Sequence, residues 1–220
     1  MLLSMNVIEL FSSIDGEGKR QGFLTTFLRL HDCNIRCSYC DTLYSYGPES
    51  TFESMSVQAV ADAIEQLENH RITITGGEPL LQEPAIIELI DELTRRNARY
   101  DFNIETNGTI IPSFHRDNVW FTYDYKTPSS LAEDAMNLDI FKVATPADII
   151  KFVVGSMQDL DRMDEILKTY PTDAQIFVSP VWGNIEGATI VDYMKAHDWQ
   201  NVRFQLQIHK FIWDPDAKGV

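Results

Sequence analysis

The sequence predicts an α/β fold, an open partial (β/α)6-type barrel in which one or more crossover helices are missing or shortened. Segments rich in β-branched and aromatic residues alternate with segments of helical periodicity, and this alternation is typical of a mostly parallel sheet with right-handed crossovers. Six or seven strands are too few for a closed eight-stranded barrel. At 220 residues and 44% hydrophobic content, the chain can bury one core, so we expect a single domain over residues 1–220.

Seven segments have the composition of strands, and each ends near Gly, Pro, Asn or Lys. They are residues 23–30, 71–77, 100–108, 119–126, 148–156, 174–182 and 202–212. Four helices are expected between them, over residues 56–69, 83–97, 157–170 and 187–197. The connection from Gly108 to Asn118 is polar and contains a proline, so we expect no crossover helix there. Because the chemistry of such folds sits at the carboxyl ends of the strands, motifs that follow strands should share one rim.

Charge and hydropathy argue against several classes of partner. Eighteen basic residues against 33 acidic ones give a formal net charge of −15, which disfavours binding to nucleic acid and to anionic membrane surfaces. No apolar run approaches the roughly 20 residues that span a bilayer, and the first residues lack the features of a signal peptide. We therefore expect a cytoplasmic protein, whose thiols stay reduced.

All three cysteines lie within DCNIRCSYCDT, residues 32–42, directly after the first expected strand. Cys33, Cys37 and Cys40 are close enough in the chain for their loop to curl around one small object. A zinc site would need a fourth ligand, for which His31 is the nearest candidate, and a disulfide would leave one thiol over. A [4Fe–4S] cluster would use three thiolates and leave one iron for a ligand that is not protein.

A second motif, TGGEP at residues 75–79, ends the second expected strand. Its glycines allow the backbone to approach a ligand closely, and a carbonyl or the Glu78 carboxylate can accept from an ammonium group. Taken alone, the motif could be a plain turn with Glu78 exposed. Its position one strand after the cysteines favours a shared ligand site.

With Tyr39 before the last cysteine, Cys33-x3-Cys37-x-Tyr39-Cys40 resembles the cluster motif of the radical S-adenosylmethionine (SAM) superfamily. In that superfamily SAM chelates the fourth iron, and a GGE segment meets its amino group. The resemblance implies a radical SAM domain with a [4Fe–4S] cluster on the three cysteines and SAM as cofactor. It also implies SAM contacts from Tyr39, Cys40, Asp41, Gly76, Gly77 and Glu78.

The flanking sequence is similar to the 7-carboxy-7-deazaguanine synthases of queuosine and 7-deazapurine biosynthesis. The likeness runs from ELFSSIDGEGKRQGFLTTFLRLHDC (9–33) through ITGGEP and IETNGT to QIHK (207–210), and so covers the chain end to end. It implies a carbon–nitrogen lyase that converts 6-carboxy-5,6,7,8-tetrahydropterin to 7-carboxy-7-deazaguanine with loss of ammonia. Two positions depart from the family, because Asp15 replaces the usual Gln and Asp124-Tyr125-Lys126 replaces Ser-Pro-Lys.

The resemblance also implies a mechanism. Reductive cleavage of SAM yields a 5′-deoxyadenosyl radical, which takes the hydrogen from C6 of the pterin before the ring contracts. We therefore expect no catalytic residue beyond the cofactors. A flavodoxin or ferredoxin is the expected electron donor, with Lys19, Arg20 and Arg36 as a candidate basic docking patch near the cluster loop. The family commonly forms homodimers.

Residue chemistry and the resemblance assign the rest of the site. Arg29 can offer a carboxylate two parallel donors, although it could instead pair with an acid such as Glu17. The resemblance implies that Thr42 binds Mg²⁺, although it could instead cap the turn after the cysteines. Further SAM contacts are expected from Glu105, Asp124, Tyr125 and Lys126. Substrate contacts are expected from Ile14, Asp15, Gly16, Glu17, Arg29, Thr75, Asn107, Gln207 and His209.

The last of these contacts depend on the end of the chain. Gln207 and His209 alternate in the last expected strand, so both should point to one face. We expect this strand and the tail, residues 205–220, to close over the active site.

Two other functions remain open at this stage. A glycyl-radical-enzyme activase would share the cysteines and the GGE motif, but it would have no use for Arg29 or the IDGEG turn. A non-enzymatic iron–sulfur or zinc binding module would differ in its metal content, because a zinc protein would hold one zinc in place of about four irons.

Overall fold

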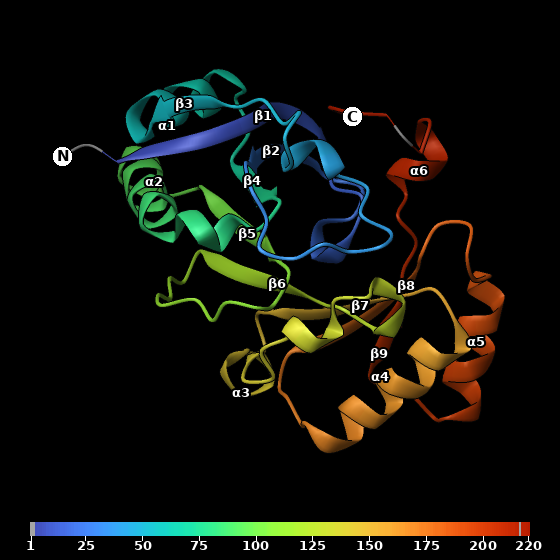
Figure 1. Ribbon diagram of the computed structural model, residues 1–220. Coiled ribbons are helices and arrows are strands. Elements are labelled where there is room, and N and C mark those ends of the chain that lie inside the picture. The colour runs from blue at the N-terminus through green and yellow to red at the C-terminus, as the bar shows by residue number, and fades with distance from the viewer. Residues whose placement is uncertain (1–2, 216) are drawn as a thin grey trace.

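The computed structural model describes residues 3–215 and 217–220, which fold around one sheet (Figure 1). Its strands are β1 (Ser4–Ile14), β2 (Leu24–Leu30), β3 (Glu53–Ser56), β4 (Arg71–Gly76), β5 (Asp101–Thr106), β6 (Val119–Tyr125), β7 (Ile149–Val154), β8 (Gln175–Pro180) and β9 (Val202–Phe204). They are ordered β3-β1-β2-β4-β5-β6-β7-β8-β9, and every neighbouring pair from β2 to β9 is parallel. The edge strands β3 and β9 do not pair, so the sheet stays open and the predicted α/β fold is confirmed.

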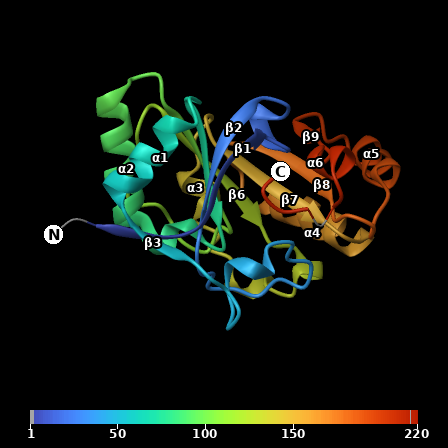
Figure 2. The ribbon, with the colours of Figure 1, turned by 90° about the horizontal axis from the view of Figure 1, so that it is seen from above.

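Helices cover the outside of this sheet, with α1 (Val57–Gln66) and α2 (Glu83–Arg96) beside its first strands and α4 (Met157–Thr169) and α5 (Gly187–Ala196) beside its last (Figure 2). Two further helices, α3 (Ile140–Val143) and α6 (His209–Ile212), are single turns. Ser56 and Ser156 begin α1 and α4, because each hydroxyl accepts a hydrogen bond from a backbone N–H three residues later. No helix in the described part of the chain is long and apolar enough to cross a bilayer.

The connections between strands follow the prediction in two places. No helix lies between β5 and β6, as the polar stretch from Gly108 to Asn118 indicated. Between β6 and β7 only α3 and the short 3-10 turns η4 (Pro128–Ser130) and η5 (Glu133–Ala135) are present. The barrel therefore has missing and shortened crossover helices.

The two faces of the sheet differ in chemistry, because successive side chains in a strand point to opposite faces. The outer face packs against the helices with fully buried apolar residues, among them Leu28, Ile74, Ile104, Phe152 and Val178. The inner face carries polar neighbours of the same strands, namely Arg29, Thr75, Glu105, Asp124 and Lys151. Parallel strands buried on both faces usually read as continuous apolar runs, so the polar inner face indicates a ligand site.

The sheet differs from the prediction at three strands. β1 and β3 were not predicted, and they extend the sheet beyond β2 by antiparallel pairing. The strand expected over residues 202–212 ends at Phe204, because the chain then turns toward the β1–β2 hairpin and Ile208 N donates to Gly16 O (3.1 Å). Gln207 and His209 therefore do not alternate on a strand, and His209 begins α6.

Candidate active site

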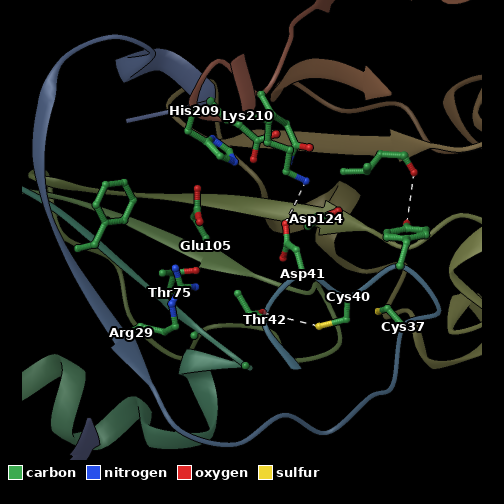
Figure 3. A pocket seen from close by; sticks show the side chains of 18 of the residues that line it. Arg29, Cys37, Cys40, Asp41, Thr42, Thr75, Glu105, Asp124, His209 and Lys210 are labelled. Atoms are coloured by element: carbon green, nitrogen blue, oxygen red, sulfur yellow. Dashed lines mark hydrogen bonds and ion pairs between the residues drawn. The ribbon is translucent and has the colours of Figure 1, made fainter. Parts of the chain in front are cut away.

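One cavity of about 280 Å³ lies inside the curved sheet (Figure 3). Every residue that the sequence predicted for the site lines it, with the exception of Glu78 and Tyr125. The cysteine loop and the carboxyl ends of β4, β5 and β6 contribute to its wall, and so do the β1–β2 hairpin and the carboxyl-terminal tail. The fold therefore brings together motifs that lie up to about 200 residues apart in the chain.

The three thiols lie in the loop that follows β2, and none forms a disulfide. Cys33 Sγ lies 3.7 Å from Asn107 Nδ2, and Cys40 Sγ lies 3.7 Å from Thr42 Oγ1. Burial is the main cause that raises the pKa of Cys33, and it raises the pKa of Cys37 to about 11.

The donor set fits an iron–sulfur cluster better than a single metal ion. Within residues 3–215 and 217–220, no group of three or more His, Cys, Asp or Glu is arranged to hold a metal ion. His31, the candidate fourth zinc ligand, packs at a tilt against Phe52 with ring centroids 4.3 Å apart and does not line the cavity. A cubane cluster takes one thiolate on each of three irons, so its cysteines need not converge on one point.

Gly76 and Gly77 allow the start of the cysteine loop to pack directly on the end of β4. Gly76 has φ +148°, and a Cβ on it would lie 2.2 Å from Leu30 O. A Cβ on Gly77 would lie 2.0 Å from Asp32 O. Gly77 N donates to Leu30 O (3.2 Å), and Glu78 N donates to Asp32 O (2.7 Å). The glycines are therefore needed for the cysteine loop to pack against the end of β4, whatever ligand the loop holds.

Glu78 points away from the cavity and is fully buried. Its carboxylate accepts from Leu80 N (2.9 Å), Thr106 Oγ1 (2.9 Å) and Asn107 N (2.7 Å). Burial raises the pKa of Glu78, and these donors oppose the rise. Its side chain joins the ends of β4 and β5 from the protein interior.

Tyr125 also points away from the cavity. Its ring packs against Phe152 with centroids 4.9 Å apart, and its hydroxyl donates to Glu133 (2.9 Å). Within the Asp124-Tyr125-Lys126 segment, Asp124 and Lys126 line the cavity. Of the three side chains, only these two can meet a ligand there.

Arg29 pairs with an acid, but not with Glu17. Arg29 Nε lies 2.6 Å from Glu9 Oε1, and the hydroxyl of Tyr44 donates to the same oxygen (2.8 Å). Figure 3 shows Arg29 beside Thr75, its register partner on β4, at the edge of the cavity. Sequence reasoning missed Glu9 and Tyr44, which no motif marks as partners of Arg29.

The β1–β2 hairpin forms the end of the cavity that lies away from the cysteine loop. Asp15 is 2% exposed and accepts from Thr73 Oγ1 (3.2 Å). Burial, with a smaller contribution from the charge of Glu105, raises its pKa to about 7. A Cβ on Gly16 would lie 2.0 Å from His209 Nδ1, so the glycine leaves room for the His209 ring against this turn. Burial also lowers the pKa of His209, which keeps its ring neutral.

A network of ion pairs crosses the cavity wall. Glu17 Oε2 lies 2.9 Å from Lys151 Nζ, and Asp124 Oδ2 lies 3.5 Å from the same nitrogen. Lys126 Nζ lies 3.0 Å from Asp124 Oδ2. Sequence reasoning missed Lys151, although a lysine inside the apolar run IIKFVV (149–154) is an unusual feature that could have marked it.

The carboxyl-terminal tail crosses the cavity. Asp214, Pro215, Ala217, Gly219 and Val220 contribute to its lining. Lys210 Nζ lies 3.4 Å from Asp41 Oδ2, and Lys218 Nζ lies 4.3 Å from the ring centroid of Tyr44. In Figure 2 the carboxyl terminus lies over the middle of the fold. The tail thus bridges the hairpin and the end of the cysteine loop.

The basic docking patch predicted near the cysteine loop does not form, because two of its three residues lie elsewhere. Lys19 and Arg20 stack on Trp120, and Arg20 pairs with Asp101 (2.7 Å) at the amino end of β5. The cysteines follow the carboxyl end of β2, so these two cations lie at the other end of the parallel strands. Of the three proposed residues, Arg36 alone adjoins the cysteines, where its guanidinium donates to Cys33 O (2.6 Å).

The chain is similar to known proteins over nearly its whole length. A model of the Radical SAM superfamily matches residues 29–137. The 7-carboxy-7-deazaguanine synthase of Clostridium acetobutylicum is 38% identical over 99% of this chain and 100% of its own length. The synthase of Leptospira interrogans is 36% identical over 99% of each chain. In fold, the chain resembles QueE from Escherichia coli, with a TM-score of 0.69 and 23% identity over 92% of this chain and 93% of that one.

We predict that Gly77→Ala lowers the iron that the reconstituted protein retains. The added methyl would lie 2.0 Å from Asp32 O and 2.8 Å from Cys33 Cβ, so the backbone at the start of the cysteine loop must move. Gly155→Ala is the matched control, because its nearest neighbours lie at 3.4 Å. Iron and sulfide analysis after anaerobic reconstitution measures the effect. Equal iron in the two variants would show that the close approach does not position the thiols.

We predict that Asp15→Asn flattens the dependence of folding stability on pH. The folded protein holds the Asp15 proton up to about pH 7, whereas the unfolded chain releases it near 3.8. The folded state therefore binds more protons between these values, and the wild-type free energy of unfolding falls as pH rises through this window. Urea unfolding at pH 5 and pH 8 should show a smaller fall in the variant. An equal fall in the free energy of unfolding for the two proteins would contradict the prediction.

Proposed function

The chain belongs to the 7-carboxy-7-deazaguanine synthase family within the radical SAM superfamily, and from this we propose that it converts 6-carboxy-5,6,7,8-tetrahydropterin to 7-carboxy-7-deazaguanine with loss of ammonia. One observation carries the proposal, namely that three free thiols share a cavity with carboxylates, ammonium groups and a guanidinium. Such a wall suits a small, highly polar molecule. Neither a glycyl-radical-enzyme activase nor a metal-binding module accounts for this set of groups or for the named relatives.

Membership of the superfamily implies a [4Fe–4S] cluster and SAM, which when bound would pass on an electron from an external donor and supply the hydrogen abstraction that the reaction requires. In this chain Cys33, Cys37 and Cys40 would hold the cluster. Asn107 would orient the Cys33 thiolate, since its amide donates toward that sulfur. No side chain is needed to carry a radical.

The SAM subsite, in our proposal, lies between the glycines of β4 and the end of β6. Gly76 and Gly77 would present their backbone to the ammonium group of SAM. Tyr39 would pack against the SAM molecule. Asp124 keeps one buried oxygen, Oδ1, without a hydrogen-bond partner, and this oxygen would accept from SAM. Asp41, Glu105 and Lys126 would complete the wall. Glu78 and Tyr125 would contribute through their backbone, since their side chains are used inside the protein.

The substrate subsite, in our proposal, extends from Arg29 to the β1–β2 hairpin. Glu9 engages Nε of Arg29, which would aim the rest of the guanidinium at the substrate carboxylate. Glu17 and Glu105 would accept from N–H groups of the pterin, and the neutral ring of His209 would contact it. Ile14, Asp15, Gly16, Thr75, Asn107 and Gln207 would supply the remaining contacts. The tail over the cavity would exclude water from the reacting atoms.

We propose Thr42 as the protein ligand of Mg²⁺. Thr42 begins the turn η2 (Leu43–Ser45), but its side chain makes no capping hydrogen bond there. Thr42 lines the cavity, and its hydroxyl has only a 3.7 Å contact with Cys40 Sγ, which leaves an oxygen for a metal that keeps several waters and takes few protein ligands.

The remaining proposals concern the whole protein. The enzyme would form one radical SAM domain over residues 1–220, with residues 205–220 closing over the active site. It would receive electrons from a flavodoxin or a ferredoxin. It would act as a homodimer in the cytoplasm.

The proposal is tested by incubating the reconstituted, reduced protein with SAM and the carboxy-pterin without oxygen. We expect 7-carboxy-7-deazaguanine and ammonia, and a faster reaction when Mg²⁺ is added. Cleavage of SAM without the deazaguanine would retain the cofactors and reject the substrate. A rate that does not respond to Mg²⁺ would reject the role of Thr42.

We predict that Arg29→Lys raises the KM for the carboxy-pterin roughly 10- to 100-fold, because a hydrogen bond to a charged group contributes about 1.5–3 kcal/mol. The lysine keeps the charge but loses the paired donors that match a carboxylate. Arg95→Lys is the matched control, since Arg95 is 71% exposed on α2 and far from the substrate subsite in the fold. Steady-state kinetics measure the effect, and equal KM values for the two variants would remove Arg29 from the substrate subsite.

A further inference from the structure

Lys151 lies in the middle of β7, where all six residues are buried. Its side chain is 7% exposed. An ammonium group removed from water without partners is strongly unfavourable, so its environment must supply compensating charge. The run IIKFVV would make an ordinary core strand with an apolar residue at this position. The presence of the lysine therefore calls for an explanation.

Three carboxylates from three separate elements surround this ammonium. Glu17 comes from the β1–β2 hairpin and lies 2.9 Å away, and Asp124 comes from β6 and lies 3.5 Å away. Glu105 of β5 acts on it through its charge. Burial alone would lower the pKa of Lys151, but these three charges outweigh it and hold the pKa well above its ordinary value. Lys151 is thus charged at any physiological pH.

The other charged groups around Lys151 do not replace it. Lys126 pairs with the Asp124 oxygen that Lys151 also contacts. His209, from α6, acts on the same network, but burial keeps its ring neutral. Asp15, beyond Glu105, adds a further acidic group at the hairpin end. In this network Lys151 is the cation that faces both Glu17 and Glu105.

The three carboxylates belong to both proposed subsites, and Figure 3 shows Glu105 and Asp124 extending into the same cavity from neighbouring strands. Glu17 and Asp124 each place one oxygen on Lys151 and keep a second, buried oxygen without a partner. A carboxylate held by one oxygen has a fixed direction, and its other oxygen remains an acceptor. This arrangement suits ligand donors better than it suits a closed ion pair in a core.

We propose that Lys151 is a positioning residue that holds Glu17 as a carboxylate directed at the substrate, Asp124 as a carboxylate directed at SAM, and Glu105 as a carboxylate that lies in both subsites. One ammonium group thereby links the two subsites. The identity of the two ligands rests on the proposed function, but the effect of Lys151 on the carboxylates does not.

The proposal has a consequence with a definite sign. An opposite charge lowers the pKa of a carboxyl group, so removing Lys151 raises the pKa of Glu105 and of Asp124, both of which its charge now holds down. Burial already raises the pKa of Glu105, and the charge of Lys151 is the largest effect that opposes the rise. Without Lys151, Glu105 keeps its proton to higher pH, and the protonated group can donate a hydrogen bond where the carboxylate only accepts.

The first test needs no activity. Infrared spectra of the cluster-loaded protein at pH 7 should show an additional carbonyl band of a protonated carboxyl group in Lys151→Met, compared with the wild type. Lys151→Arg keeps the charge and should lack the additional band, and Lys151→Met combined with Glu105→Gln should lose it again. Lys151→Gln serves the same purpose if the methionine variant does not fold. A neutral variant that folds without this band overturns the proposal.

The second test uses the reaction. In Lys151→Met the acid limb of the kcat/KM profile for the carboxy-pterin should move to higher pH by about 1–3 units. Lys151→Arg should keep the wild-type acid limb even if its rate is lower. A uniform loss of rate with an unmoved acid limb would mean that Lys151 only supports the fold. Absence of deazaguanine from the wild type would reject the proposed function, while the infrared result would still decide the role of Lys151.

Discussion

The close packing of the cysteine loop on the end of β4 is the constraint on which the site depends. Leu30 O and Asp32 O accept from the backbone N–H groups of Gly77 and Glu78. No side chain fits at Gly76 or Gly77. Glu78 then joins the end of β4 to the end of β5, because its buried carboxylate accepts from Thr106 and Asn107. Asn107, just past that end, donates back toward Cys33 and thereby closes a ring of contacts around the loop. The loop is thus held from two strands at once.

A polar barrel interior follows from the same arrangement. The helices on the outside cover the apolar face of the sheet, so the inner face is free to carry charged and polar residues. The hairpin and the tail contribute to the wall of the cavity, and they contact each other where Gly16 O accepts from Ile208 N. Burial of the polar groups is unfavourable for stability. It persists here because the carboxylates, ammonium groups and hydroxyls satisfy one another and, in our proposal, the ligands.

Two of the departures from the usual family sequence, Asp15 and Asp124, lie within this interior, whereas Tyr125 packs against Phe152 outside the cavity. Asp15 occupies the hairpin end of the cavity and is held by Thr73, and its pKa of about 7 keeps it a hydrogen-bond donor below about that pH. Asp124 replaces a serine and is balanced by Lys126 and Lys151. The altered side chains therefore lie in a charge network that can accommodate them. The substitutions are compatible with the activity that the relatives carry in their name.

Local features of the sequence determined much of the fold and the place of the site. Strand and helix periodicity located seven of the nine strands in the described part of the chain, the last with too late an end, and the four long helices, and the spacing of the cysteines and glycines placed both motifs on one rim. These features are readable because they depend on neighbours within a few residues. The tertiary structure alone decided which partner each charged side chain takes. It turned Glu78 inward, paired Arg29 with Glu9, and joined Lys151 to Glu17, 134 positions away in the chain. Periodicity indicates which face a side chain occupies, but a buried charge is stabilised by whatever opposite charge the fold brings within a few ångströms, and that choice exists only once the chain has folded.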